Sequence, residues 1–309
     1  MFQKLIKFIV NPSYRFDILR ARGYYDELPD DEYLKRVFKS RVGYDLNLSN
    51  PITFNEKIQW LKLHDRNPEY VKLVDKKEVK EWVAKVVGSE YVIPTLGCWD
   101  SFEEIGFDEL PNRFVLKCTH DSGGVVLVED KTNFDEAAAR KKLTRSLNKN
   151  YFLSGREWPY KEIKPRIIAE EFLNSPASDL VDYKFMCFNG EVKYAFTCSN
   201  RSMGDLRVDF FDANWNHLPF ERHYPNSDSA ILPPISLDRM IDAAEKLSYR
   251  IPFVRVDFYE VSGRPLFGEM TFYPGSGFEE FTPVEWDEII GACLNLDWVK
   301  NRNSYMERN

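Results

Sequence analysis

A lysine followed by a glycine-rich loop is the first feature of the sequence with the residue types for chemistry. Lys117 lies at the end of the apolar run 114–118, and Ser122, Gly123 and Gly124 follow in the next loop. Glycine lets backbone N–H groups approach a phosphate closely, and a fixed lysine adds one positive charge. The arrangement predicts a loop that covers nucleotide phosphates. The alternative from these residues alone is an ordinary hairpin tip, so the interpretation depends on partners elsewhere.

Two carboxylates near the end of the chain are candidate partners. Asp257 and Glu269 each alternate with apolar residues in neighbouring strand-like segments. An odd-length loop centred on Gly263 would place them opposite each other on one face of a hairpin, whereas a two-residue loop would place them on opposite faces. Facing carboxylates repel unless a cation lies between them. Mg²⁺ with ATP oxygens is one such cation, and Arg255 is the other, so both interpretations stay open here.

A third polar group is predicted on the hairpin around Asn189-Gly190, the strongest two-residue turn signal in the chain. Such a turn pairs Phe188 with Glu191. It places on one face Asp182, Lys184, Ala195 and Thr197, and Arg201 joins them if the strand continues. Cations beside a carboxylate suit a polyphosphate or an anionic substrate. The alternative is a solvated sheet face with routine ion pairs.

The elements that must position these groups are indicated by the hydrophobic pattern and the turn signals. From residue 30 to about residue 65 the pattern is helical, with Thr53 and Glu56 at the spacing of a capping box. Asp75 and Glu78 repeat that spacing at the start of a second helix. We expect further helices at 133–148, 236–249 and 286–296, strands at 114–118, 125–128, 166–173, 253–261 and 266–273, and a hairpin at 182–198.

Composition excludes several classes of protein. The 309 residues carry a net charge of −7, and the basic residues are dispersed among the acidic ones, which argues against a general nucleic-acid binder. The five cysteines lie far apart and form no CxxC pair, so neither a zinc site nor a disulfide framework is indicated. We therefore expect reduced thiols and a cytoplasmic protein.

The first ten residues are apolar and include Lys4 and Lys7, and Asn11-Pro12 ends the run well short of a transmembrane segment. No small-residue cleavage signature follows it. We expect a helix that docks on the protein's own core. The alternative is peripheral contact of residues 1–10 with the inner membrane face.

Taken in order, these segments resemble the ATP-grasp superfamily, and most closely the TupA-like ATP-grasp family, which is named for teichuronopeptide synthesis. The resemblance runs from about Thr53 to Leu296. The segments that carry it are Thr53–Trp60, Asp75-Lys76, Ile93–Gly97, Phe114–Gly124, Arg156–Trp158, Asp182–Phe185, Val254–Tyr259 and Gly268–Gly277.

The resemblance implies an α+β, ATP-grasp fold in which two α+β lobes clamp the nucleotide. It implies an N-terminal, mainly helical region at 1–66, an N-terminal lobe with the glycine loop at 67–165, and a C-terminal lobe with Mg²⁺-binding strands at 166–309. One departure from the superfamily is Glu269-Met270-Thr271, where Glu-x-Asn is usual. A threonine hydroxyl is a weaker and shorter ligand than an amide, so a second Mg²⁺ would be loosely held or completed by water.

The resemblance also implies roles for individual residues. The ATP phosphates would be bound by Lys76, Lys117, His120, Ser122, Gly123 and Gly124. The adenine and ribose would lie against Glu170, Glu171 and Phe172, with Glu170 preferred for the base. Asp182 would also bind the nucleotide cofactor. The catalytic cations would be Lys184, Arg201 and Arg255. Magnesium would be held by Asp257, Glu269 and Thr271.

The implied function is an ATP- and Mg²⁺-dependent carboxylate–amine ligase that forms an amide through an acyl phosphate. Its partners would be a small-molecule or glycan carboxylate and an amine acceptor. The resemblance points to cell-surface polysaccharide assembly, such as capsule biosynthesis, with an amino acid joined to a uronic acid or to another amino acid. The alternatives are an ATP-grasp phosphotransferase or kinase that acts on a sugar or small metabolite, and a nucleotide- or glycan-binding module without turnover.

Overall fold

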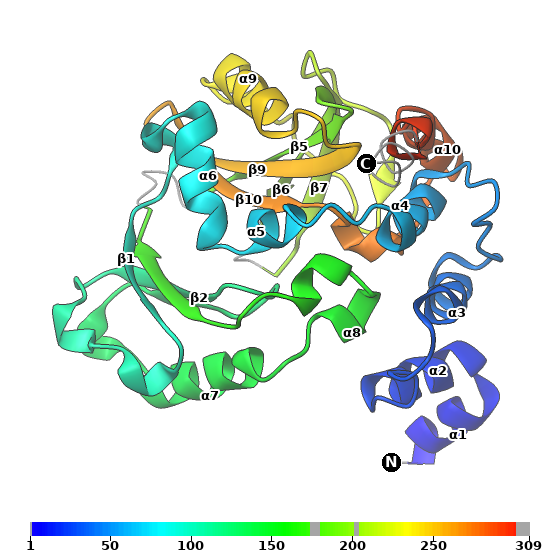
Figure 1. Ribbon diagram of the computed structural model, residues 1–309, viewed down its shortest axis with the longest axis horizontal. Helices are drawn as coiled ribbons and strands as arrows, with labels where there is room; N and C mark the ends of the chain where they lie inside the picture. Colours follow the sequence, from blue (N-terminus) through cyan, green and yellow to red (C-terminus); the bar gives the residue numbers. More distant parts are fainter. Residues whose placement is uncertain (1, 174–179, 201–203, 301–309) are drawn as a thin grey trace, which may run out of the picture.

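The computed structural model describes residues 2–173, 180–200 and 204–300 (Figure 1). Its helices are α1 (Phe2–Val10), α2 (Pro12–Ala21), α3 (Asp30–Val42), α4 (Phe54–His64), α5 (Tyr70–Val74), α6 (Glu78–Val87), α7 (Glu136–Leu147), α8 (Phe152–Gly155), α9 (Leu237–Leu247) and α10 (Glu285–Ala292). Its strands are β1 (Thr95–Trp99), β2 (Phe114–Cys118), β3 (Val125–Val128), β4 (Ile167–Glu171), β5 (Asp182–Phe188), β6 (Glu191–Ser199), β7 (Arg207–Asp212), β8 (Glu221–Arg222), β9 (Phe253–Val261), β10 (Arg264–Thr271) and β11 (Phe281–Thr282).

The larger lobe is built on an antiparallel sheet in the order β10-β9-β5-β6-β7. Side chains along β9 alternate between the two faces of this sheet. Val254, Val256 and Phe258 are fully buried in the main core, and α9 covers that face (Figure 1). Arg255 and Asp257 point to the opposite face. The alternation therefore leaves one face of the sheet for chemistry.

The smaller lobe is an antiparallel sheet in the order β1-β4-β2-β3, with α7 packed against β2 and β3 (Figure 1). Its core is separate from the main core and includes Phe114, Leu116 and Ala169. Lys117 and Glu170 lie at alternate positions of the same strands and therefore point away from that core. This lobe turns its polar face toward the larger lobe.

The core clusters correct two of the expected domain boundaries. The strand β4 was assigned to the C-terminal lobe, but it pairs with both β1 and β2 in the smaller sheet. The helices α5 and α6 were assigned to the glycine-loop lobe, but Leu73, Val79 and Val83 are buried in the main core of the larger lobe. Sequence order alone does not show these memberships, because both depend on contacts between distant segments.

The helical stretch expected from residue 30 to about residue 65 is two helices. Gly43, with φ of 96°, ends α3, and α4 begins only after an irregular loop. The capping box at the start of α4 is confirmed, since Thr53 accepts from the backbone of Glu56 and the Glu56 carboxylate accepts from the backbone of Thr53. The second predicted helix is also confirmed as α6, which Gly88 ends.

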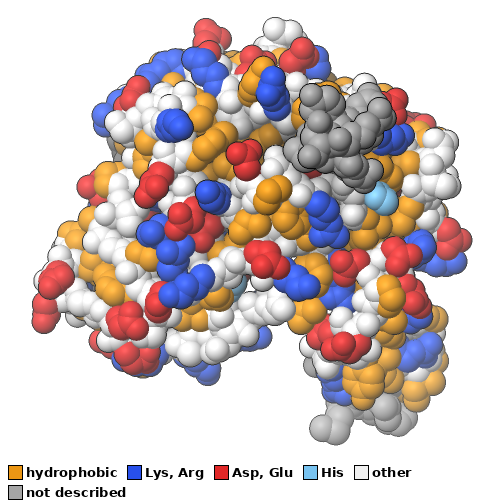
Figure 2. Space-filling model, viewed as in Figure 1, with side chains coloured by type: hydrophobic (Ala, Val, Ile, Leu, Met, Phe, Trp, Pro, Cys, Tyr) orange, Lys and Arg blue, Asp and Glu red, His pale blue; other side chains and the backbone are white. Residues whose placement is uncertain are grey.

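The helices α1 and α2 form a protrusion at one side of the molecule (Figure 1). As expected, α1 ends at Val10, and α2 begins after the Asn11 cap. However, α1 packs on α2, and Ile6, Ile9 and Val10 are 44%, 62% and 69% exposed, so docking on the protein's own core was wrong. Hydrophobic side chains are visible on this protrusion (Figure 2). Contact of residues 1–10 with a membrane surface stays a prediction.

Among the described residues, none of the helices combines the length and the apolar character needed to cross a bilayer.

Candidate active site

The β9–β10 hairpin brings the two candidate carboxylates opposite each other, but not by the expected route. The turn is a two-residue one, Ser262-Gly263, with φ of 53° and 70°. A regular ladder from that turn would place Asp257 and Glu269 on opposite faces. The register shifts by one residue between Phe267 and Glu269, and Asp257 then pairs with Glu269. The bulge at Gly268, rather than an odd-length loop, therefore places the two carboxylates on the same face.

One guanidinium group links the two carboxylates. Arg255 donates through Nε to Asp257 Oδ1 at 2.6 Å, and through Nη2 to Asp257 Oδ2 and Glu269 Oε1, both at 2.7 Å. The same Nη2 lies 2.9 Å from Thr271 Oγ1, whose hydroxyl donates to Glu269 at 3.0 Å. Burial opposes ionisation of Glu269, but Arg255, Lys76 and Lys184 outweigh it and lower the pKa of Glu269 to about 2. Glu269 is therefore charged at neutral pH.

The β5–β6 hairpin adds a buried lysine to this cluster. The predicted pairing of Phe188 with Glu191 is confirmed, but a register shift follows between Met186 and Cys187. Lys184 consequently pairs with Phe196 rather than Ala195, and Ala195 and Thr197 lie on the opposite face from Asp182 and Lys184. The expected one-face group of four was therefore wrong in its β6 half.

Lys184 and Asp182 remain at the site. Lys184 contacts the Asp257 carboxylate and lies 3.6 Å from Asp182 Oδ2. Burial disfavours the charge on Lys184, but Asp257 outweighs this effect and raises the pKa of the lysine. Arg201, the third expected cation of this group, lies outside the described residues.

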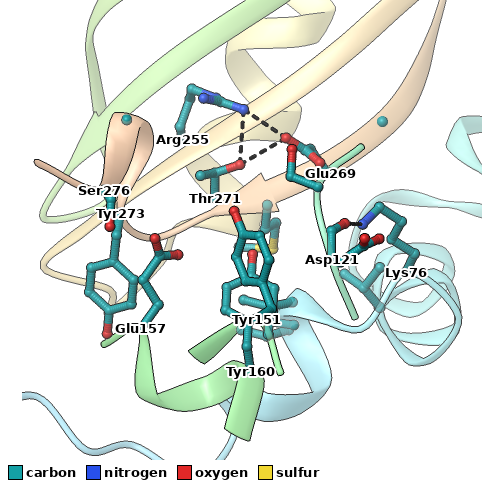
Figure 3. A pocket seen from close by; sticks show the side chains of 17 residues that line it. Lys76, Asp121, Tyr151, Glu157, Tyr160, Arg255, Glu269, Thr271, Tyr273 and Ser276 are labelled. Carbon is teal, nitrogen blue, oxygen red and sulfur yellow. Dashed lines mark hydrogen bonds and ion pairs between the residues drawn. The ribbon is translucent and has the colours of Figure 1, made fainter. Parts of the chain in front are cut away.

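A cavity of about 260 Å³ lies against this cluster, between the two lobes (Figure 3). Arg255, Glu269 and Thr271 line it from the larger sheet. Lys76, Asp121 and Ser122 line it from the α5–α6 connection and the glycine loop. The rest of the wall is formed by Leu73, Val74, Val79, Tyr151, Glu157, Tyr160, Gly268, Met270, Tyr273, Gly275 and Ser276.

The glycine loop is held by contacts at both ends. Cys118 N donates to Gly124 O at 2.8 Å, which closes the β2–β3 connection. Gly123 has a φ of 104°, which glycine adopts readily. A Cβ at Gly124 would lie 2.4 Å from Ser146 Oγ and 2.8 Å from Asp121 Oδ1, so the backbone approaches these side chains closely. Lys76 donates to the carbonyl of Asp121 across the lobe junction.

His120 is not exposed to the cavity. The side chain is buried, and Nε2 lies 3.3 Å from Lys149 O. Burial lowers the pKa of His120, so the ring is neutral at physiological pH. This geometry fits the loop-stabilising role of a histidine, and the expected contact with phosphate stays a proposal.

Lys117 belongs to a second polar cluster outside the cavity wall. Its Nζ lies 2.5 Å from Glu170 Oε2, and Lys80 Nζ lies 2.5 Å from the other oxygen of Glu170. Burial opposes ionisation of Glu170, but the two lysines outweigh it and lower the pKa of Glu170. Lys80 was missed from the sequence, because nothing there distinguishes it from Lys85, the other lysine of α6.

The segment expected to face the adenine lies at the end of β4. The backbone of Glu170 is paired with both β1 and β2, so it is not free to read a base. Glu171 is exposed and ends the strand, and its N–H donates to Pro94 O at 3.1 Å. The Phe172 ring follows, with the Arg113 guanidinium 4.2 Å from its centroid. The Glu170 carboxylate, which was expected to contact the base, is thus paired with Lys80 and Lys117 in this structure.

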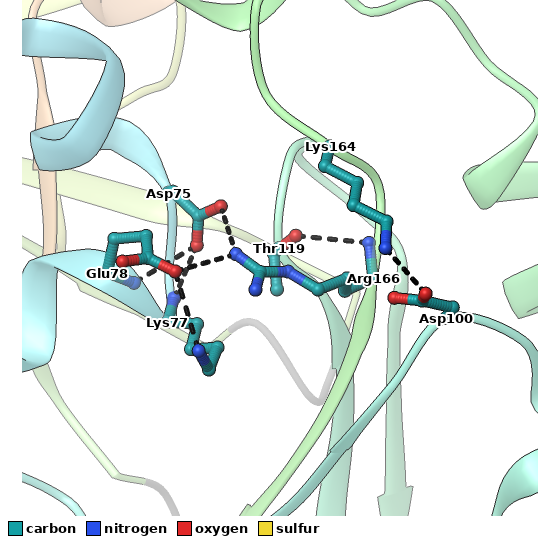
Figure 4. A network of polar contacts seen from close by, with 7 residues as sticks. All are labelled: Asp75, Lys77, Glu78, Asp100, Thr119, Lys164 and Arg166. Carbon is teal, nitrogen blue, oxygen red and sulfur yellow. Dashed lines mark hydrogen bonds and ion pairs between the residues drawn. The ribbon is translucent and has the colours of Figure 1, made fainter.

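An ion-pair network fixes the two lobes beside the site (Figure 4). Arg166, directly before β4, donates to Asp75 at 3.2 Å and to Glu78 at 2.9 Å at the start of α6. The Arg166 backbone exchanges hydrogen bonds with Thr119 at the start of the glycine loop. Lys76 N also donates to Thr119 O at 3.1 Å. The glycine loop and the α5–α6 connection therefore form one supported unit.

The donor set fits a hard divalent cation. Two carboxylates and a hydroxyl oxygen surround the Arg255 Nη2 position, and oxygen ligands of this kind are those that Mg²⁺ prefers. Of the two interpretations left open by the sequence, the structure contains the arginine one, with both acids neutralised. Among the described residues no three His, Cys, Asp or Glu side chains form a complete metal site, so phosphate oxygens and water would supply the remaining ligands.

A cleft between a glycine-loop lobe and a larger antiparallel sheet, with paired acids on the last hairpin, defines the chain as an ATP-grasp protein. The profile of the family described as "TupA-like ATPgrasp" matches residues 56–295. The chain therefore belongs to the TupA-like ATP-grasp family, as the sequence predicted, and the predicted α+β fold class is confirmed.

Solved structures similar to this chain include D-alanine–D-alanine ligases and an L-amino acid ligase. The Bacillus anthracis D-alanine–D-alanine ligase is 18% identical over 66% of this chain and 57% of its own, with a TM-score of 0.37. The Helicobacter pylori enzyme is 14% identical over 73% and 61%, with a TM-score of 0.41. The Bacillus licheniformis L-amino acid ligase is 12% identical over 72% and 49%, with a TM-score of 0.41.

This chain thus spans between 49% and 61% of the length of these three proteins. No curated protein matches the sequence.

Proposed function

We propose that this protein is an ATP- and Mg²⁺-dependent carboxylate–amine ligase that works through an acyl phosphate. The observation that carries the proposal is the set of residues that line the cavity. On one side of the cavity are Lys76 and Ser122 with the glycine loop, and on the other are Arg255 and Glu269. A loop that covers phosphates therefore faces cations and carboxylates across a space of about 260 Å³. Membership of an ATP-grasp family supports the same chemistry.

In the proposed reaction, an oxygen of the substrate carboxylate attacks the γ-phosphorus of ATP in line, and ADP leaves with the electron pair of the broken bond. Arg255 and Lys184 would offset charge on the transferred phosphoryl group, and Lys76 would hold the glycine loop closed over it. When bound, Mg²⁺ would be held by Asp257 and Glu269, with Thr271 beside them, and would neutralise phosphate charge. The amine then forms the amide, and phosphate leaves.

We further propose that Lys117 and Lys80 contact the α- and β-phosphates after Glu170 releases them, and that Glu171 and Phe172 lie beside the nucleoside. Support comes from position: Lys117 and Glu170 lie on the polar face of the smaller lobe, next to the end of β4, and Lys80 contacts Glu170 from α6 of the larger lobe. The protein would act in the cytoplasm, where ATP is available. The proposed setting is cell-surface polysaccharide assembly, with a uronic acid or an amino acid as the carboxylate, and it rests on the family resemblance.

The test measures ADP release with a panel of carboxylates, including D-glucuronate, D-galacturonate and L-glutamate, in the presence of hydroxylamine. A ligase should form a hydroxamate with at least one carboxylate, because hydroxylamine captures the acyl phosphate. A stable phosphorylated product without hydroxamate would instead identify a phosphotransferase. Binding of Mg-ATP without ADP release for any carboxylate would identify a module without turnover.

A further inference from the structure

The Arg156-Glu157-Trp158 segment is anchored on both sides of its central residue. Arg156 is buried and donates to the carbonyls of Tyr25 at 3.1 Å and Asp26 at 2.7 Å, between α2 and α3. Trp158 Nε1 donates to Asp65 O at 2.9 Å, directly after α4. The proposed phosphoryl transfer uses neither residue. Their contacts hold Glu157 in place between them.

Glu157 is buried, with 6% of its surface exposed, and lines the cavity (Figure 3). Ser276 lines the cavity beside it. The carbonyl of Ser276 accepts from Lys62 Nζ at 2.7 Å, and its Oγ accepts from the same nitrogen at 3.0 Å. Gln59 Nε2 donates to the carbonyl of Gly277 at 2.7 Å. The loop that carries Ser276 is therefore held from behind by α4.

Lys62 does not form an ion pair with Glu157. Its ammonium contacts Gln59 Oε1 at 2.9 Å in addition to the two oxygens of Ser276, and these three contacts match its three hydrogen-bond donors. Within the described part of the chain, no nitrogen of a basic side chain lies within 4.0 Å of the Glu157 carboxylate. A buried carboxylate without a contacting cation is costly, unless the site exists to bind one.

The surroundings of Glu157 suit a small organic cation. Tyr151 and Tyr160 line the same cavity, with ring centroids 4.8 Å apart, and aromatic rings attract ammonium groups. Tyr151 lies between Glu157 and Glu269, and both acids, after burial, raise its pKa. We infer that Glu157 binds the ammonium group of the amine acceptor, at the opposite end of the cavity from the Arg255–Glu269 cluster; this assignment rests on the proposed ligase function.

The chemistry requires such a group, because an ammonium ion has no lone pair. The ammonium group would transfer one proton to the Glu157 carboxylate and become a neutral amine. Its nitrogen would then attack the carbonyl carbon of the acyl phosphate, the C–N bond would form, and phosphate would leave with the C–O electron pair. The second N–H proton would leave with phosphate or go to water. Burial raises the pKa of Glu157 against the opposing effects of Lys62 and Ser276, which makes it a stronger base than an exposed glutamate.

The experiment compares wild type with Glu157→Gln, Glu157→Asp and the control Glu162→Gln, whose side chain is exposed at the end of the same segment. Hydroxamate formation with the carboxylate panel measures the acyl phosphate step, since hydroxylamine is neutral and needs no ammonium site. Amide formation from the same carboxylate with each of the amino acids as acceptor measures the second step. We expect Glu157→Gln to keep hydroxamate formation within about twofold and to raise the KM for the acceptor at least tenfold.

We expect Glu157→Asp to recover part of that loss and Glu162→Gln to behave as wild type. An unchanged acceptor KM in Glu157→Gln, with intact hydroxamate formation, would overturn the assignment and leave the ligase function standing. Loss of hydroxamate formation in Glu157→Gln alone would also overturn it, because Glu157 would then serve the first step or the fold. No hydroxamate from wild type with any carboxylate would overturn the proposed function and this inference together.

Discussion

At the scale of single residues, Arg255 decides the electrostatics of the site. Its guanidinium contacts both Asp257 and Glu269, at the position where a divalent cation would also be favourable. Metal binding with ATP would therefore have to displace Arg255 from one carboxylate or use their other oxygens. A displaced Arg255 would be free to contact the transferred phosphoryl group. The arginine and metal interpretations would then describe successive states of one site.

The first prediction concerns the Mg²⁺ requirement. Asp257→Asn removes one of the two charges that would hold the ion, while the amide keeps one oxygen ligand. We expect the Mg²⁺ concentration for half-maximal ADP release to rise about tenfold, the size of one lost charge-assisted contact. The matched control is Asp238→Asn on the exposed surface of α9, which should leave the Mg²⁺ curve unchanged. If Asp257→Asn showed the same Mg²⁺ dependence of ADP release as wild type, Asp257 would not be a metal ligand.

The second prediction concerns Lys117. Lys117→Ala should abolish ATP turnover, because Glu170 would keep only Lys80 and the phosphates would lose their strand cation. The measurement is ADP release at saturating carboxylate. The control is Lys142→Ala, which removes one exposed lysine of α7. If Lys117→Ala turned over ATP at the wild-type rate, the second polar cluster would be structural only.

The third prediction concerns pH. The folded-state pKa of Glu269 is lowered to about 2 from an ordinary 4.5, so its ion pair contributes stability above pH 4.5 and loses it as pH falls toward 2. Because the Glu269 side chain is 40% exposed, the contribution should be about 1 kcal/mol rather than the full value of the pKa shift.

Urea unfolding of wild type and Glu269→Gln measures this contribution. The difference in unfolding free energy between the two proteins should be largest near neutral pH and should shrink between about pH 4.5 and pH 2. A difference that stays constant across that window would mean that the Glu269 carboxylate gains nothing from its neighbours.

At the scale of elements, α4 and the loop between β10 and β11 determine one wall of the cavity. Gly275, Ser276 and Gly277 all have positive φ values, of 57°, 54° and 63°. A Cβ at Gly277 would lie 2.5 Å from Gln59 Nε2 and 2.6 Å from Ile58 Cγ2. The helix therefore packs so closely on the loop that position 277 accepts only glycine.

The fourth prediction follows from this packing. Gly277→Ala should lower the free energy of unfolding by about 2–4 kcal/mol, from backbone strain together with overpacking. Gly43→Ala is the control, because Gly43 also has a positive φ of 96° but a Cβ there would meet no atom within 4 Å. It should cost about 1 kcal/mol, from strain alone. Equal costs for the two variants would show that contact with α4 is unimportant.

At the scale of the whole molecule, the two lobes have separate cores, and a few polar links join them near the site. Arg166 with Asp75 and Glu78 is one link, and Lys80 with Glu170 is another. Backbone hydrogen bonding of Lys76 to Thr119 adds a third. Since these links lie beside the glycine loop, the relative position of the lobes and the position of the loop should change together.

The fifth prediction uses Arg166→Met, which keeps an unbranched stem of similar bulk and removes the guanidinium group. We expect the KM for ATP to rise about tenfold, because the glycine loop loses its support, while both cores stay intact and the protein stays folded. Lys164→Ala is the control, since Lys164 pairs with Asp100 on the exposed surface (Figure 4). An unchanged KM for ATP in Arg166→Met would separate the ion-pair network from nucleotide binding.

What the sequence by itself determined was local. Thr53 and Glu56 predict the start of α4, Asn189-Gly190 predicts the β5–β6 turn, and Lys117 with the following glycines predicts a strand and loop. These signals were right because each depends on the backbone preferences or short-range hydrogen bonds of a few neighbouring residues. Motif order across the chain was sufficient for the family and for the fold class.

Only the tertiary structure decided how those elements meet. The bulge at Gly268 set the register that pairs Asp257 with Glu269, and a second shift in β5–β6 moved Ala195 and Thr197 off the site face. The position of β4 between β1 and β2, and the places of Lys80 and Glu157, also depended on distant segments. Sheet register and lobe contacts are set by the packing of residues far apart in the chain, and no local pattern carries that information.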